Sequence, residues 1–167
     1  MPLPREIIVR PARLDDVESI VGFSAAMALE TEGRRLNRAQ LREGTLSLFT
    51  TPAYGFFMVA EWPHAEQPQL VGQLMITYEW SDWRNAVFWW IQSVYVHTEW
   101  RRRGVFTRMH QAVLQEARAR TDVCGVRLYV DKDNPTAHST YERLGMTRSP
   151  YQIYESDFVL LPKTLKE

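Results

Sequence analysis

A run of three arginines followed by a glycine carries the most specific chemistry in this chain. Arg101, Arg102 and Arg103 precede Gly104, and the residues on either side predict a strand that turns directly into a helix. Unpaired backbone N–H groups and the helix dipole attract anions to a helix start, and glycine lets the backbone approach a ligand closely. The turn therefore predicts a phosphate site, with a solvated basic turn as the alternative interpretation.

A second segment lies downstream and begins at Asn134. It reads Asn134-Pro135-Thr136-Ala137 and then, after three residues, Tyr141-Glu142-Arg143-Leu144-Gly145-Met146. Together the two segments resemble the GNAT family of N-acetyltransferases, whose patterns are Q/R-x-x-G-x-G/A in the coenzyme A loop and N-x-x-A-x-x-x-Y-x-x-x-G-F downstream. This chain departs from the patterns at Phe106, where the family has a small residue, and at Met146, where it has phenylalanine.

The resemblance implies both a fold and a coenzyme site. The implied fold is α/β (α+β), with a mixed, mostly antiparallel central sheet flanked by about four helices, in a single domain over residues 1–167. Acetyl-CoA would lie along a splayed strand, because an extended ligand rich in amides can pair with a free strand edge. The implied cosubstrate-binding residues are Tyr95, Val96, Arg101, Arg102, Arg103, Gly104, Val105, Phe106, Thr107 and Asn134.

By the same resemblance, Tyr141 is the general acid. In the family reaction a neutral amine attacks the thioester, and the departing thiolate takes a proton from a tyrosine at this position. A phenol and a thiol have pKa values of about 10 and 8.5, close enough for this transfer. A half-buried helix aromatic is the alternative interpretation of Tyr141.

The sequence is less informative about the general base. Family members often place a carboxylate on the central strand, whereas residues 89–94 hold no acid. Diamine acetyltransferases, which residues 78–83 otherwise resemble, tend to have an acidic pair where Gln92 and Ser93 stand, so a polyamine acceptor is disfavoured. We predict Glu79 as the base, acting through a bound water, with Glu30 and Glu32 as alternatives. The competing interpretation is that all three are ordinary exposed carboxylates.

The aromatic residues and histidines support few further assignments. Trp89 and Trp90 are adjacent in an expected strand, so they must point to opposite faces, and one of them is a candidate for an acceptor pocket or a dimer contact. No histidine has a partner at metal-ligand spacing, so no metal is predicted. Cys124, the single cysteine, is expected to be a small buried side chain.

The periodicity of apolar residues predicts alternating strands and helices that position these segments. Asn37 is a candidate helix cap, and Gly145 a helix stop. Strands are expected at residues 7–9, 55–61, 70–79, 86–97, 126–130 and 151–160, and helices at residues 14–29, 38–49, 103–117 and 134–144.

Composition excludes several classes of protein. The 167 residues carry 20 Lys and Arg against 20 Asp and Glu, so neither nucleic acid nor a membrane surface is an expected partner. We expect a cytoplasmic protein, because there is one cysteine, no signal-like start and no long apolar run. The acidic and basic residues are unevenly distributed along the chain. Residues 14–32 hold five acids and no Lys or Arg, whereas residues 101–120 hold six arginines and one glutamate.

These observations predict an acetyl-CoA dependent N-acetyltransferase that acts directly on a primary amine of a small molecule, with a homodimer as a possible state. Three alternatives remain open at this level. In the first, the acceptor is an amine of a peptide or protein. In the second, the chain is a non-catalytic acyl-CoA sensor. In the third, the arginine turn (residues 101–104) binds a nucleotide such as ATP.

Overall fold

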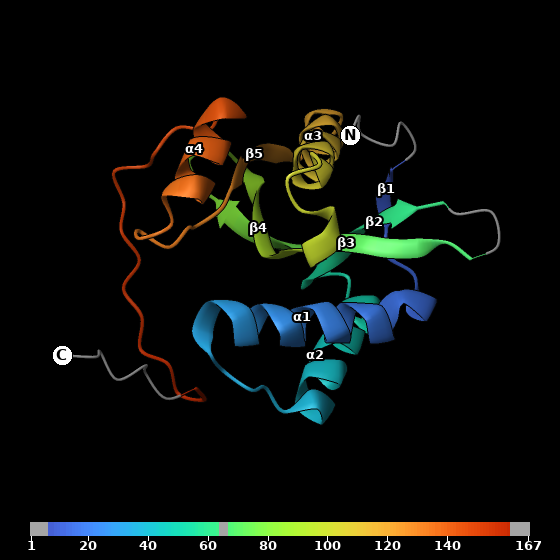
Figure 1. The fold of residues 1–167 in the computed structure, drawn as a ribbon. Helices are drawn as coiled ribbons and strands as arrows, with labels where there is room; N and C mark the ends of the chain where they lie inside the picture. Colours follow the sequence, from blue (N-terminus) through green and yellow to red (C-terminus); the bar gives the residue numbers. More distant parts are fainter. Residues whose placement is uncertain (1–6, 64–66, 161–167) are drawn as a thin grey trace. The chain divides into compact units, whose positions relative to one another are not determined.

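The computed structural model of the chain describes residues 7–63 and 67–160 (Figure 1). It forms two compact units, Met1–Tyr129 and Val130–Glu167.

The first unit is built on a five-stranded sheet in the order β1-β2-β3-β4-β5. Neighbouring strands are antiparallel except β4 and β5, which are parallel. The strands are β1 (Ile8–Pro11), β2 (Gly55–Trp62), β3 (Gln69–Ser81), β4 (Ala86–Val96) and β5 (Val123–Arg127). The expected α/β class and the mostly antiparallel sheet are thus confirmed.

Helices cover both faces of this sheet. The helices α1 (Val17–Glu32) and α2 (Arg38–Thr50) lie on one side and α3 (Val105–Arg118) on the other (Figure 1). Two short 3-10 turns, η1 (Leu14–Asp16) and η2 (Thr98–Trp100), lead into α1 and the arginine turn, and the second unit contains α4 (Pro135–Arg143). Asn37 caps α2 as expected, since its side chain accepts from the Gln40 N–H at 3.1 Å.

Apolar side chains fill the space under each layer of helices. The buried residues of α3 recur at every fourth position, Val105, Met109, Val113 and Ala117, and pack with Leu74, Ile76 and Trp89 of the sheet. On the opposite face, Ile20 of α1 packs with Phe57 and Val59 of β2. Burial of each large apolar side chain contributes about 1.5–3 kcal/mol, so the helices hold the sheet on both sides.

A bulge in β4 separates two halves of that strand. Gln73 of β3 pairs with Tyr95, whereas Met75 pairs with Gln92, so β4 has one more residue than β3 across this interval. Ser93 lies in this interval with a positive φ of 50°, a conformation that favours glycine. On its other side β4 pairs with β5 only as far as Trp90, opposite Arg127. Among the described residues no strand continues this pairing, so the edge of β4 beyond Trp90 is open, as the resemblance implied.

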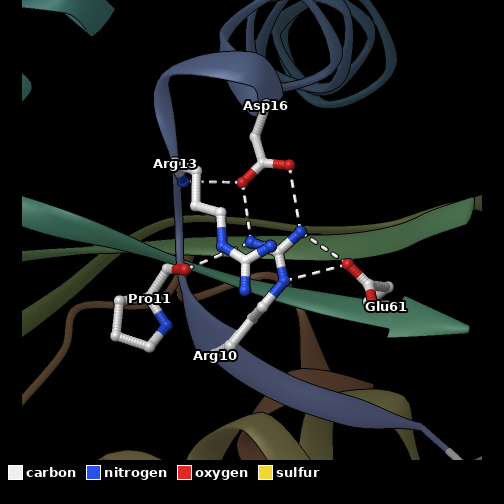
Figure 2. A network of polar contacts seen from close by, with 5 residues as sticks. All are labelled: Arg10, Pro11, Arg13, Asp16 and Glu61. Atoms are coloured by element: carbon white, nitrogen blue, oxygen red, sulfur yellow. Dashed lines mark hydrogen bonds and ion pairs between the residues drawn. The ribbon is translucent and has the colours of Figure 1, made fainter. Parts of the chain in front are cut away.

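An ion-pair network joins the start of the sheet to the start of α1 (Figure 2). The Arg10 guanidinium donates to Asp16 at 2.8 Å and to Glu61 of β2 at 2.5 Å. Asp16 also accepts from the Arg13 N–H at 2.7 Å. Burial raises the pKa of the Asp16 carboxyl, but the hydrogen bonds from Arg10 and Arg13 outweigh that effect and hold the pKa below its usual value.

Two expected strands differ from the structure. The strand expected at residues 126–130 is β5, which begins earlier and ends at Arg127, because β4 leaves its neighbour after Trp90 and offers no further partner. The strand expected at residues 151–160 is wrong: these residues form no strand and are exposed. The Asp157 carboxylate instead accepts from the N–H groups of Val159 and Leu160, at 2.8 and 2.7 Å, which removes them from any ladder.

Candidate active site

The open edge of β4 leads directly into the arginine turn (residues 101–104). Tyr95 and Val96 pair with Gln73 and Gly72 of β3, which leaves their other edge without a partner strand among the described residues. Strand β4 ends at Val96, and η2 then carries the chain to Arg101. An unpaired strand edge offers backbone donors and acceptors to an extended ligand.

The arginine turn leads directly into the first turn of α3. Arg102 and Gly104 both adopt left-handed conformations, with φ of 61° and 73°. The N–H of Arg108 is the first to bond back, to the Gly104 carbonyl at 3.1 Å. The N–H groups of Val105, Phe106 and Thr107 precede it, in the helical position that attracts phosphate.

The arginines of the turn have different surroundings. Arg101 donates to the Val96 carbonyl at 2.9 Å, and the Arg103 guanidinium lies 5.3 Å from the centre of the Trp100 ring. Arg102 is exposed. The Phe106 side chain, which departs from the family pattern, packs into the core cluster under α3, with its ring 5.9 Å from that of His110.

Glu30, in the last turn of α1, connects the acidic helix to this basic turn. It accepts from Arg101 at 2.6 Å and from the Tyr95 hydroxyl at 3.1 Å. The hydrogen bond from Arg101 lowers the pKa of the Glu30 carboxyl. Burial and the hydrogen bond to Glu30 raise the pKa of the Tyr95 phenol. The first arginine of the turn therefore already has an anionic partner in the protein.

A polar cluster lies on three neighbouring strands, reaching along β4 toward the bulge. We call it the Glu79–Arg127 cluster; it comprises Thr77, Glu79, Trp90, Gln92, Arg127 and Tyr129. Arg127 donates to Glu79 at 2.7 Å, and the Trp90 indole donates to the other oxygen of the same carboxylate. Farther along, Gln92 donates to the Thr77 hydroxyl at 2.5 Å. Both oxygens of Glu79, the predicted base, are thus engaged by protein donors.

The second unit holds the two remaining predicted residues. The Asn134 side chain caps α4 by accepting from the Ala137 N–H at 3.0 Å, and Pro135 occupies the first helical turn. Tyr141 lies on α4, and burial raises the pKa of its phenol. Gly145 follows the helix with φ of 84°, which confirms the expected helix stop.

Sequence reasoning missed two features of the site. No local pattern in the sequence indicates that Arg127 meets Glu79, 48 positions away. The bulge at Ser93 was also missed, because the residues of β4 read as one continuous strand. Trp89 and Trp90 do point to opposite faces: Trp89 is buried in the core, whereas Trp90 bonds to Glu79. Cys124 is half-buried.

Known proteins were compared with the chain. The sequence profile of the acetyltransferase (GNAT) family matches residues 14–146. A solved structure of a possible acetyltransferase from Clostridium difficile 630 is 38% identical, with a TM-score of 0.82, and the match covers 93% of this chain and 100% of that one. No curated protein matches the chain.

Two more distant structures share the fold. One is a predicted acetyltransferase with acetyl-CoA from Clostridium acetobutylicum, 16% identical with a TM-score of 0.71, over 90% of this chain and 96% of that one. The other is a glucosamine-6-phosphate N-acetyltransferase from Arabidopsis thaliana, 14% identical with a TM-score of 0.67, over 91% and 99%. Within the described residues, no helix combines the length and the apolar character needed to cross a membrane.

Proposed function

The chain belongs to the acetyltransferase (GNAT) family, and from that membership we propose that it transfers an acetyl group from acetyl-CoA to a primary amine of a small molecule. The observation that carries this proposal is the open edge of β4 running into the arginine turn and the start of α3. Acetyl-CoA has an extended arm rich in amides that is followed by phosphates. Its binding site therefore requires a strand edge for the arm and, next to it, an anion site for the phosphates.

The residues present fit acetyl-CoA in charge and hydrogen-bonding capacity. The backbone edge at Tyr95 and Val96 suits the pantetheine amides, and the turn with Arg101, Arg102 and Arg103 suits the pyrophosphate. Asn134 is the proposed contact to the coenzyme arm. When bound, acetyl-CoA supplies the activated acetyl group and the thiolate that leaves.

Tyr141 is the proposed proton donor to that thiolate. Its pKa is raised by burial, so the phenol keeps its proton throughout the neutral range and is available as an acid. Glu79 is the predicted base for the amine, acting through water, but both oxygens of its carboxylate already accept from Arg127 and Trp90, so the Glu79→Gln variant discussed below decides between this role and one of holding Arg127. For an α-amine with pKa near 8, this deprotonation costs only about 1.4 kcal/mol at pH 7.

A mass-spectrometric screen tests the proposal. The chain is incubated with acetyl-CoA and two sets of acceptors, small primary amines and short peptides, and calorimetry measures binding of acetyl-CoA, CoA and ATP. We expect acetylated small amines and binding of both coenzyme forms. Acetylation confined to peptides would contradict the small-molecule acceptor. Coenzyme binding without turnover of any amine would indicate a sensor, and binding of ATP alone would overturn the coenzyme assignment.

A further inference from the structure

Arg127 is held in one orientation by its neighbours on the sheet. Its guanidinium carbon lies 3.6 Å from the centre of the Phe88 ring, a close stacking contact. One terminal nitrogen, Nη1, donates to Glu79 at 2.7 Å. A flat guanidinium fixed on one face and at one end has lost most of its rotational freedom before any ligand arrives.

The rest of the guanidinium is available to a ligand. The Arg127 side chain keeps 33% of its surface exposed. Within the part of the chain that the structure describes, its only recorded partners are Glu79 and the Phe88 ring, although a guanidinium has five N–H donors. The Nε and Nη2 donors form the fork that matches a carboxylate or a phosphate.

Glu79 does not compete strongly with an incoming anion. Its two oxygens are directed to Arg127 and to the Trp90 indole, so it acts here as the group that orients the arginine. The same chain shows that one arginine accommodates two carboxylates, because Arg10 bonds to both Asp16 and Glu61. Arg127 would then have two carboxylate partners, Glu79 and the acceptor, just as Arg10 has Asp16 and Glu61.

The cluster also shares strand β4 with the proposed coenzyme edge. Arg127 is opposite Trp90, where pairing of β4 with β5 ends, and Gln92 and the bulge at Ser93 follow along the same strand. The Trp90 and Tyr129 rings lie 5.8 Å apart beside the arginine and add flat apolar surface. Glu79 and Arg127 are the cluster's only charged members, so Arg127 is the one member of the cluster that can form an ion pair with an anionic ligand.

We propose that Arg127 binds an anionic group of the acceptor, a carboxylate or a phosphate, so that the acceptors of this enzyme are primary amines that carry an anion at their other end. This inference rests on the proposed acetyltransferase activity and adds the substrate class. Glu79 is then a positioning residue for Arg127. Arg127 is opposite Trp90, and the bulge at Ser93 lies three residues further along β4, roughly 10 Å at about 3.3 Å per residue, so acceptors with several bonds between amine and anion fit better than glycine.

Matched pairs of acceptors test the proposal on the wild-type protein. One series is the ω-amino acids from glycine to 6-aminohexanoate, each compared with its carboxamide, and a second is the aminoalkyl phosphates compared with the amino alcohols. We expect at least about tenfold higher kcat/KM for the anionic member of the preferred length, as for one charge-assisted hydrogen-bond pair. Preference in the first series identifies a carboxylate, and in the second a phosphate. Equal rates within both series would overturn the inference.

Variants then locate the preference at Arg127. Arg127→Gln should raise KM for the anionic acceptor about tenfold and make acid and amide equivalent, while leaving the Kd of acetyl-CoA unchanged. Arg127→Lys keeps the charge but loses the paired N–H donors of the guanidinium. Its KM for the anionic acceptor should lie between those of the wild type and Arg127→Gln. Arg84→Gln is the matched control, since Arg84 lies 5.0 Å from the centre of the same Phe88 ring and has no bond to Glu79.

The outcomes separate this inference from the proposed function. Full acid preference retained in Arg127→Gln, or lost equally in Arg84→Gln, would overturn the role of Arg127. If Arg127→Gln fails to fold, as judged by circular dichroism, the wild-type comparison and Arg127→Lys still decide. If amines are acetylated without any preference for an anion, only this inference is contradicted. If no amine is acetylated, the acetyltransferase proposal itself is contradicted.

Discussion

The Arg101 guanidinium donates to the Glu30 carboxylate at 2.6 Å, which ties the first residue of the arginine turn to the last turn of α1. The acidic and basic stretches of the sequence therefore meet at the site where an anionic coenzyme is proposed to bind. The pair is partly exposed, with 42% and 38% of the two side chains accessible, so its contribution to stability is small. Its importance lies in the electrostatic potential at the turn.

Replacement of Glu30 by glutamine should tighten acetyl-CoA binding about twofold to fivefold, because it removes an anion next to the proposed pyrophosphate site. Calorimetry at low and high salt checks this, and the gain should shrink as salt screens the charges. Glu32→Gln, on the same helix end and paired with Arg34 at 3.6 Å, is the control. Weaker binding in Glu30→Gln would show that Glu30 holds Arg101 in its binding position.

Tyr141→Phe should lower kcat about a hundredfold, because the thiolate loses its proton donor, and should change the Kd of acetyl-CoA by less than about twofold. Burial raises the pKa of Tyr141 above 10.0, so ionisation of this phenol should cause no loss of wild-type activity below that pH. Steady-state kinetics from pH 6 to 10 measure both effects. Tyr54→Phe, at an exposed tyrosine in a turn, is the control, and an unchanged kcat in Tyr141→Phe would contradict the acid role.

Glu79→Gln distinguishes a base from a positioning residue. If Glu79 removes the proton from the amine, kcat falls and the acidic limb of the pH profile is lost. If it orients Arg127, KM for an anionic acceptor rises severalfold and the shape of the profile is kept. We expect the rise in KM to dominate, because both carboxylate oxygens are engaged by Arg127 and Trp90.

Asp16→Asn should lower the free energy of unfolding by about 2 kcal/mol, because it removes charge-assisted bonds from Arg10 and from the Arg13 N–H. The pKa of Asp16 is lowered from 3.8, so its contribution is fully present above that pH and is lost as the pH falls through the folded-state value. Urea denaturation at pH 7 and pH 3 checks this: the difference between wild type and variant should shrink at pH 3. Asp15→Asn, at an exposed neighbour, should show neither effect.

His110→Leu should stabilise the protein most below pH 6.5. His110 is fully buried on α3, neither ring nitrogen has a hydrogen-bond partner among the described residues, and burial lowers its pKa from 6.5. As the pH falls below 6.5 the unfolded chain takes up this proton before the folded chain does, so wild-type stability falls by up to about 1.4 kcal/mol per pH unit. Denaturation curves from pH 5 to 8 should be flatter for His110→Leu, and Gln111→Leu, at an exposed position of the same helix, should keep the wild-type slope.

Local patterns in the sequence determined most of the elements and the two segments that resemble the GNAT patterns. Apolar spacing predicted the buried face of α3, and Asn37 and Gly145 mark helix ends as expected, because capping and turn preferences act over a few residues. The arginine turn and the downstream Tyr141 segment were recognised for the same reason. Each is a short, contiguous set of residues whose chemistry does not depend on distant parts of the chain.

Only the tertiary structure decided which distant groups meet. The bulge at Ser93 depends on register with β3, and the end of β5 depends on where β4 stops offering a partner. The pairs Arg101 with Glu30 and Arg127 with Glu79 join residues 71 and 48 positions apart. Propensity and periodicity report on neighbours along the chain, whereas the partners of a side chain on a sheet are set by strand order and register. For that reason the sequence indicated a coenzyme site, and the fold supplied the oriented arginine from which an acceptor class is inferred.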